Sequence, residues 1–258
     1  MLVVVDIGNT NTVFGFFEDD ELILQTRIKT DITRTEDEFF AFLILILIQK
    51  QLALEKIEAA AISCVVPMAL SGVQRFFQKY CKISPLLVSH DKHHVSIAGT
   101  PAPHLGSDLA VNAIAATELF KDHCLIVDFG TATTFSLLEY SKSKINYLGV
   151  AIAPGLNSIM QSMRKHSAQL PSLNFQKANT VLGTTTTKAM LAGSYFGFTG
   201  MVEKLIDTMK EEYKYPLKVV ATGGLSVLME DLTSKIDFIE PNLTLLGLKY
   251  FYLLNKKI

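Results

Sequence analysis

The sequence predicts an α/β protein of two related halves, because one strand–turn–strand motif occurs twice. The copies are MLVVVDIGNTNTVFGFF from Met1 and CLIVDFGTATTFSLL from Cys124. Each reads as an apolar strand, an Asp, one residue, a Gly, a run of hydroxyl or amide side chains and a second strand. Strand-like and helix-like segments alternate around both copies, as in α/β proteins. The chain of 258 residues has room for two domains, which we expect at residues 1–121 and 122–258.

The first copy predicts a β-hairpin with a polar tip. Residues 3–5 and 13–17 read as strands from their β-branched and apolar side chains, so DIGNTNT forms the connection. Gly8 lets an anion approach the backbone, and the hydroxyl and amide side chains after it supply donors for phosphate oxygens. Asp6, at the strand end, is placed to reach a divalent cation that bridges such phosphates. A hairpin that only tolerates small residues explains a single copy equally well.

Two further turns carry the same chemistry. The second copy has Asp128, Gly130 and Thr131 in the matching places. A third glycine turn, ATGG at residues 221–224, follows an apolar strand at residues 218–220 and precedes a helix-like segment. The sequence has neither the GxxxxGK[ST] pattern of a P-loop nor the GxGxxG pattern of a dinucleotide fold. The repeated turns therefore favour a phosphate-bearing ligand held by another type of fold.

Composition narrows the class of ligand. The net charge is −1 and the basic residues are scattered, so we expect no nucleic-acid or membrane surface and favour a small molecule. The three cysteines lack CxxC spacing, which argues against zinc and disulfides and for a reducing compartment. The chain begins with a strand, and its most apolar run, residues 39–48, is shorter than the roughly 20 residues of a membrane span. We therefore expect a cytoplasmic protein, with this run as a core helix or a buried subunit contact.

The remaining elements follow from local signals. After a turn at residues 18–21, residues 22–28 extend the first hairpin, and a helix begins near Thr35, with acidic residues in its first turn. Strands at residues 60–66 and 86–89 flank a further helix, and residues 92–105 read as a loop from their Gly and Pro content.

In the second half, the strand pair turns at residues 141–144, and GVAIAPG predicts another glycine–proline turn. The rest is expected to be largely helical, apart from the strand at Lys218.

Asp108 is the candidate general base. It lies in the first turn of a helix that begins at about Ser107, where backbone amides and the helix dipole stabilise an anion. From the local sequence, a capping role is the simpler interpretation, since Ser107 and Asp108 are both good capping residues. The alternative is a base for a hydroxyl that attacks a phosphate held by the hairpins.

The order of these motifs resembles the type III pantothenate kinases, in the acetate kinase, sugar kinase, Hsp70 and actin superfamily. The resemblance rests on DIGNT, GSD, DFGTATT, AIAPG, GTTTTKAM and ATGGL, and it extends over essentially the whole chain. It implies two ribonuclease-H-like (actin-like ATPase) domains with a nucleotide cleft between them, and a homodimer. It also implies ATP-dependent phosphorylation of pantothenate to 4'-phosphopantothenate, the first step of coenzyme A biosynthesis, with Mg²⁺ and a monovalent cation, K⁺ or NH₄⁺.

The resemblance also implies a role for individual residues. Asp108 matches the catalytic base, Asp6 faces Mg²⁺ and Asp128 holds the monovalent cation. The ATP-binding positions are Asp6, Ile7, Gly8, Asn9, Thr10, Asn11, Thr12, Val13 and Thr131. The substrate-binding positions are Gly106, Ser107, Asp108, Leu109 and Thr186.

The departures from the family pattern gather on the acceptor side. Leu109 replaces an Arg, and losing such a charge-assisted contact commonly costs about 1.5 to 3 kcal/mol. An aromatic residue that lines the pantothenate pocket in the family falls at Gly99. Smaller departures are Ser136 for Asp, Val150 for Gly, and Thr185 with Thr186 for Asn-Thr.

Three functions fit this pattern. The first is an active pantothenate kinase with a repacked acceptor pocket that uses Arg164, Lys165 or Lys188 in place of the lost Arg. The second is a catalytically weak or silent nucleotide-binding paralogue, and the third is a kinase for another hydroxyl-bearing metabolite. A cluster of three histidines is expected to face solvent on a polar loop, because it has no fourth ligand: His90, His93 and His94.

Overall fold

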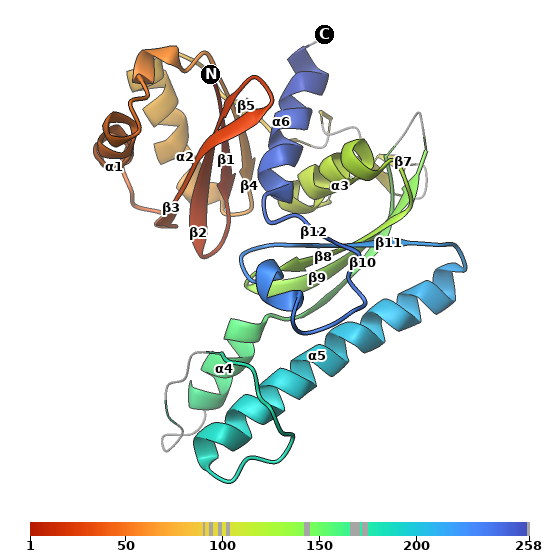
Figure 1. Cartoon of the computed structure of the whole chain (residues 1–258). Coiled ribbons are helices and arrows are strands. Elements are labelled where there is room, and N and C mark those ends of the chain that lie inside the picture. The colour runs from red at the N-terminus through yellow and green to blue at the C-terminus, as the bar shows by residue number, and fades with distance from the viewer. Residues whose placement is uncertain are drawn as a thin grey trace. The chain divides into compact units, whose positions relative to one another are not determined.

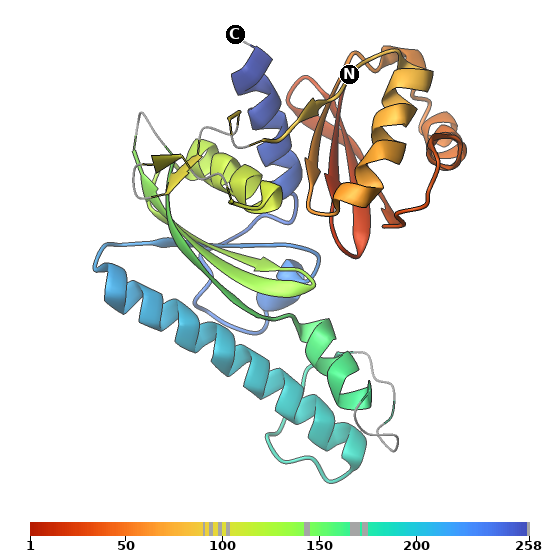
Figure 2. The ribbon, with the colours of Figure 1, turned by 180° about the vertical axis from the view of Figure 1, so that it is seen from behind.

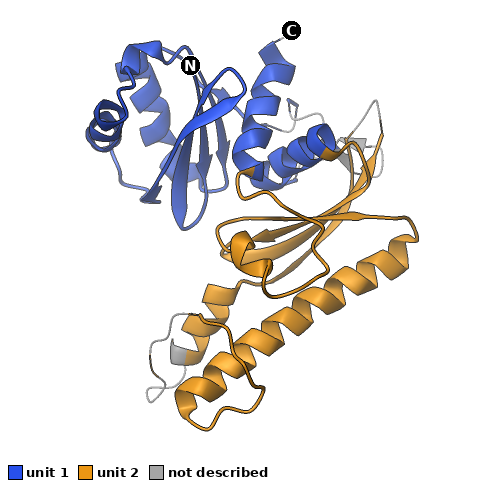
Figure 3. Cartoon of the chain, viewed as in Figure 1, with its two compact units in different colours: residues 1–119, 243–258 blue, residues 120–242 orange. Residues whose placement is uncertain are grey.

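The computed structural model describes residues 1–89, 91–92, 95–97, 100–101, 104–141, 145–165, 171 and 175–256. The chain forms two compact units (Figure 3). Unit 1 contains Met1–Leu119 and Leu243–Ile258, and unit 2 contains Phe120–Asn242. Residues 243–258 thus group with the first half of the chain, whereas the duplicated motif suggested a single division near residue 121.

Unit 1 contains a five-stranded sheet in the order β3-β2-β1-β4-β5 (Figure 1). Strands β1, β2 and β3 are antiparallel neighbours, while β4 and β5 continue the sheet in parallel with β1. The first strand pair has Asp6 opposite Val13 and Ile7 opposite Thr12, which confirms the predicted hairpin. The strands are β1 (Leu2–Ile7), β2 (Asn11–Glu18), β3 (Glu21–Lys29), β4 (Ala59–Cys64) and β5 (Leu86–Leu87).

Helices cover both faces of this sheet. Helices α1 (Glu36–Gln49) and α2 (Pro67–Phe76) share one apolar core with β1 to β4. Helix α6 (Leu243–Lys256) packs on the other face, against β1 and β4, and also contacts α3 (Ser107–Phe120). Short helical turns follow α1 and α2, at η1 (Leu54–Lys56) and η2 (Phe77–Cys81), and a short hairpin precedes α3, formed by β6 (Val95–Ile97) and β7 (Thr100–Pro101).

Helix α1 begins where the sequence predicts. The Thr35 side chain accepts a hydrogen bond from the Glu38 amide, and the Glu38 carboxylate accepts one from the Thr35 amide, which forms a capping box. The very apolar run 39–48 buries only one face of the helix: Leu43 is buried, whereas Leu45 is 71% exposed.

Unit 2 repeats the arrangement of unit 1. It contributes five strands in the order β10-β9-β8-β11-β12, with an antiparallel hairpin extended on one side and parallel strands on the other. The mixed α/β fold with two such sheets confirms the predicted fold class. The strands are β8 (Cys124–Phe129), β9 (Ala132–Tyr140), β10 (Ile145–Pro154), β11 (Lys218–Thr222) and β12 (Phe238–Ile239).

Two helices complete unit 2. The apolar residues of α4 (Leu156–Lys165) and the long α5 (Thr186–Tyr213) share a core with one face of the sheet. The views in Figures 1 and 2 agree that α4 and the first half of α5 extend beyond the sheet. None of the helices in the described residues is both long enough and apolar enough to cross a membrane.

Several local predictions were wrong. The predicted loop at residues 92–105 contains the β6–β7 hairpin, and strand β12 lies in the part of the second half that was expected to be largely helical. The segment GVAIAPG is mostly strand rather than turn, because β10 pairs with β9 as far as Pro154 and leaves only Gly155 before α4. Burial along β10 alternates as in a strand with one covered face, and the Gly and Pro residues obscured this period. After the ATGG turn the chain forms only the short 3-10 helix η3 (Ser226–Met229).

Candidate functional site

The tip of the β1–β2 hairpin is a tight turn held by backbone and hydroxyl groups. The Gly8 amide donates to the Asn11 carbonyl at 3.0 Å. Thr30, which follows β3, donates from its hydroxyl to the Gly8 carbonyl at 2.7 Å and lies 3.0 Å from the Thr12 hydroxyl oxygen. The third strand therefore fixes the shape of the turn that is predicted to bind phosphate.

Burial divides the predicted ATP-binding positions into two groups. Ile7 and Thr12 have buried side chains, so they stabilise the turn by packing inside unit 1. Asn9 and Thr10 are exposed at the tip, while four other residues are partly exposed: Asp6, Gly8, Asn11 and Val13. Only the second group offers atoms to a ligand.

The start of helix α3 is attached to the end of strand β4. The Ser107 hydroxyl accepts a hydrogen bond from the Cys64 amide at 2.9 Å and lies 3.0 Å from the Ser63 hydroxyl. Ser63 is in turn the register partner of Asp6 on β1. Because β1 and β4 run parallel, their carboxyl ends meet at one edge, and this edge brings Asp6 and Ser107 into the same region of unit 1. Ser63 and Cys64 carry no motif of their own, so the sequence did not single them out as site residues.

Asp108 is partly buried in the first turn of α3. Its Oδ1 accepts a hydrogen bond from the Leu109 amide at 2.8 Å. Burial raises the pKa of the Asp108 carboxyl above its ordinary value, and hydrogen bonds from the Leu109 and Asp108 amides oppose that shift without cancelling it. A carboxylate with a raised pKa is a better proton acceptor than an ordinary surface Asp, as a general base requires.

Cys64 shares this environment. Burial raises the pKa of its thiol, and the negative charge of Asp6 adds to the increase. This effect of Asp6 on the pKa of Cys64 agrees with the pairing of β1 and β4, which also places the Asp6 carboxylate near the end of β4.

The second predicted turn lies in unit 2, between β8 and β9. The Gly130 amide donates to the Ala132 carbonyl at 3.1 Å, so this turn is one residue shorter than the first turn, where the Gly8 amide donates to the Asn11 carbonyl. Thr131 is exposed, and its carbonyl accepts a hydrogen bond from the Ser158 hydroxyl at 2.7 Å. A side chain on Gly155 would place its Cβ 2.3 Å from that carbonyl, so a glycine before α4 allows the helix to approach the turn.

Asp128 is the penultimate residue of strand β8 and lies beside the third glycine turn. Strand β11 pairs with β8 and places Thr222 opposite Asp128. Gly223 follows with a φ of +90°, and a Cβ at this position would come 2.4 Å from Asp128 Oδ1. The turns after β8 and β11, which are distant in the sequence, thus meet at the Asp128 carboxylate.

Thr186 lies elsewhere in unit 2. It is exposed as the first residue of α5, and its neighbour Thr185 caps the helix by accepting a hydrogen bond from the Lys188 amide at 3.3 Å. The start of α5 lies at the end of the helix that extends beyond the sheet (Figures 1 and 2). The fold does not bring Thr186 to Asp128.

Several residues singled out in the sequence lie outside the described residues: Gly99, His90, His93 and His94. The side chain of Arg164 is also outside the description. The other two candidate cations, Lys165 at the end of α4 and Lys188 in the first turn of α5, are exposed.

The acidic side chains of the candidate site fit a Mg²⁺ ion that is held by few protein ligands. No group of three or more His, Cys, Asp or Glu side chains that could hold a metal ion occurs in the described part of the chain. Mg²⁺ in nucleotide sites is commonly held by one or two carboxylates together with water and substrate phosphates. A single carboxylate such as Asp6 is compatible with that mode of binding.

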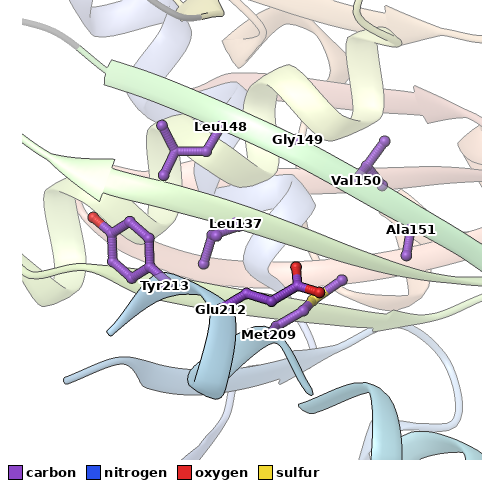
Figure 4. A pocket seen from close by; sticks show the side chains of 8 residues that line it. All are labelled: Leu137, Leu148, Gly149, Val150, Ala151, Met209, Glu212 and Tyr213. Carbon is purple, nitrogen blue, oxygen red and sulfur yellow. The ribbon is translucent and has the colours of Figure 1, made fainter. Parts of the chain in front are cut away.

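A separate pocket of about 300 Å³ lies between the sheet of unit 2 and the last turns of α5 (Figure 4). Its walls are largely apolar, and Glu212 and Tyr213 are its polar side chains from α5. None of the predicted ATP, metal or substrate residues lines it. The pocket therefore has no part in the site described above.

Comparison with solved structures finds proteins of the same fold. A putative Baf family transcriptional activator from Campylobacter jejuni is 19% identical, with a TM-score of 0.60 and coverage of 99% of this chain and 100% of that one. A putative 2-dehydro-3-deoxygalactonokinase from Sinorhizobium meliloti is 12% identical, with a TM-score of 0.57 and coverage of 100% and 97%. A glucokinase from an Antarctic psychrotroph is 10% identical, with a TM-score of 0.52 and coverage of 99% and 98%.

These similarities show a shared fold and carry no statement about substrate. The family assignment comes from the sequence. The model of the type III pantothenate kinase family matches residues 2–208, which is well over half of the chain, and the chain belongs to that family.

Proposed function

We propose that this protein transfers the γ-phosphoryl group of ATP to the primary hydroxyl of pantothenate, with Asp108 as the general base. The observation that carries the proposal is the position of Asp108, which is held at the start of α3 with a pKa raised by burial. Asp108 would accept the hydroxyl proton while that oxygen attacks the γ-phosphorus and ADP leaves. Proton acceptance by a positioned side chain commonly contributes about 10² to 10⁴ in rate.

The other predicted residues would bind and orient the reactants. Phosphoryl transfer depends mainly on positioning and on neutralising phosphate charge, and a divalent cation bound by Asp6 would supply part of that neutralisation. The exposed amide and hydroxyl groups of Asn9 and Thr10 would hold phosphate oxygens, as would Thr131 in the second turn. Asp128 would hold the monovalent cation, K⁺ or NH₄⁺.

The acceptor side is where this chain differs from its family. Gly106, Ser107, Leu109 and Thr186 would contact pantothenate, and Leu109 offers an isobutyl group where a guanidinium is usual. We propose that a cation from Arg164, Lys165 or Lys188 replaces it, in a homodimer in the cytoplasm.

The presence of Leu109 in place of an arginine also favours two functions other than pantothenate phosphorylation. One is a kinase for another hydroxyl-bearing metabolite with an apolar portion near Leu109. The other is a nucleotide-binding paralogue with little or no turnover.

The test is ADP release by the purified protein with ATP, Mg²⁺ and K⁺, with and without pantothenate. Pantothenate-dependent ADP, with 4'-phosphopantothenate identified by mass spectrometry, supports the proposal when Asp108→Asn abolishes it and still binds ATP. Stimulation only by another alcohol from an acceptor panel identifies the second function. ATP binding with no stimulation by any acceptor identifies the silent paralogue.

A further inference from the structure

Two threonine hydroxyls are buried without a hydrogen-bond partner near the β8–β9 turn of unit 2. Thr133 and Thr222 are both fully buried, and neither Oγ1 has a partner among the described residues. A buried hydroxyl that makes no hydrogen bond loses its hydration without compensation, so each such group calls for an explanation.

The sheet register separates these two hydroxyls. Thr222 on β11 is paired with Asp128 on β8, and paired residues of neighbouring strands share a face of the sheet. Thr133 on β9 is paired with Phe129, which belongs to the core beneath α4 and α5. Thr222 therefore lies on the face of Asp128, while Thr133 lies on the opposite face.

Glycine turns leave a space for the Asp128 carboxylate. A Cβ on Gly223 would lie 2.4 Å from Asp128 Oδ1, and a Cβ on Gly130 would lie 3.6 Å from the same oxygen. Gly223 has a φ of +90°, which disfavours any other residue at this position. Its carbonyl is engaged by the Ser226 hydroxyl at 2.8 Å and the Ser226 amide at 3.1 Å, which fixes the turn.

We propose that the Thr222 hydroxyl is a ligand, together with Asp128, of the monovalent cation, and that Gly223 positions the Asp128 carboxylate for that role. The inference rests on the proposed assignment of this cation to Asp128. Hard cations take oxygen ligands, and neutral oxygens are the ligands by which proteins bind K⁺ in filters. One carboxylate and one hydroxyl match a cation of single charge, and coordination would satisfy the orphan oxygen of Thr222.

The test measures binding of the cation by its effect on the melting temperature, which does not depend on enzymatic turnover. The melting temperature is recorded as KCl replaces choline chloride at constant ionic strength, with and without a non-hydrolysable ATP analogue and Mg²⁺. Thr222→Val removes the hydroxyl and keeps the shape, and Thr222→Ser keeps the hydroxyl. Thr133→Val is the matched control, because it deletes an equally buried, equally unpartnered hydroxyl on the other face.

We expect the wild type to be stabilised by K⁺ and Thr222→Val to need at least about tenfold more K⁺ for half of the effect, equivalent to the loss of one good contact. Thr222→Ser and Thr133→Val should keep a midpoint near that of the wild type. An unchanged midpoint in Thr222→Val, an equal shift in Thr133→Val, or no response of the wild type to K⁺ would each overturn the inference.

Acceptor-dependent ADP release by the wild type, measured separately, tells whether the proposed kinase function stands. Turnover with an unaltered Thr222→Val midpoint overturns the ligand assignment alone. A Thr222-dependent K⁺ response without turnover supports the ligand assignment and contradicts the kinase.

Discussion

Gly106 lies against the carboxylate of Asp108, so that a Cβ on Gly106 would come 2.6 Å from Asp108 Oδ1. The Gly223–Asp128 pair in unit 2 has the same relationship, with a corresponding distance of 2.4 Å. In both units, then, a glycine next to a candidate functional carboxylate leaves room for one of its oxygens. At Gly106 the requirement is steric, because its backbone lies outside the left-handed region.

Gly106→Ala should displace the Asp108 carboxylate and lower turnover. Misplacing a catalytic group by about 1 Å can reduce the rate by about 10²-fold, so we expect a fall in kcat of about ten- to a hundredfold. Steady-state kinetics and a melting curve check this together. Gly149→Ala is the control, since its Cβ would meet nothing within 4 Å. Unchanged kcat in Gly106→Ala would contradict a catalytic role for the present carboxylate position.

Asp108→Asn should stabilise the protein at neutral pH while it removes activity. Burial raises the pKa of Asp108 above 3.8, so the folded state holds more protons at this site than the unfolded state between 3.8 and the raised value. The free energy of unfolding therefore falls as the pH rises through that window, and above it the ionised carboxylate leaves the native state less stable. The neutral side-chain amide of Asp108→Asn does not carry the free-energy cost of burying a charge, so the variant should be more stable at neutral pH.

Urea denaturation of the wild type and Asp108→Asn at several pH values checks this prediction. The difference in free energy of unfolding should grow as the pH rises through the window and then level off. A wild type that is more stable than the variant at pH 7 would contradict a carboxylate destabilised by burial. The kcat of the wild type should also fall on the acid side, as Asp108 becomes protonated.

Ser107→Ala should destabilise unit 1 and loosen the start of α3. The substitution leaves the Cys64 amide without the acceptor it has at 2.9 Å, which costs about 1 to 3 kcal/mol for a buried donor. Ser63→Ala removes only the hydroxyl contact at 3.0 Å and leaves the amide bond of Cys64 in place, so its effect should be smaller. Urea titrations of both variants compare the losses in free energy of unfolding. Equal stability of the wild type and Ser107→Ala would contradict the inference that Ser107 anchors the start of α3 to β4.

The hairpins and helix starts were predictable because they are encoded locally. β-Branched residues flank the DIGNTNT turn, and the Thr35–Glu38 capping box is contained in four residues. Helix α3 likewise begins at Ser107, where the local sequence predicts a helix start.

The features of the fold and of the site that were not predicted depend on contacts between segments that are distant in the sequence. Ser107 reaches Cys64 across 43 positions, and Gly223 meets Asp128 only because β11 pairs with β8. The alternation of β10 was hidden by residues that usually signal turns. The grouping of α6 with unit 1 depends on its packing against β1, β4 and α3, which no local pattern in residues 243–256 reports.

Leu109→Arg tests whether the acceptor pocket is one for pantothenate. Leu109 is partly exposed one position after Asp108, so an arginine there has access to the region that the general base serves. If pantothenate is the acceptor, the restored guanidinium should lower its KM by about ten- to a hundredfold, the value of a charge-assisted contact, with little change in kcat. Leu109→Met, which keeps an apolar side chain of similar volume, should leave KM near the wild-type value. A higher KM in Leu109→Arg, together with better use of an apolar alcohol by the wild type, would mean that Leu109 selects a different acceptor.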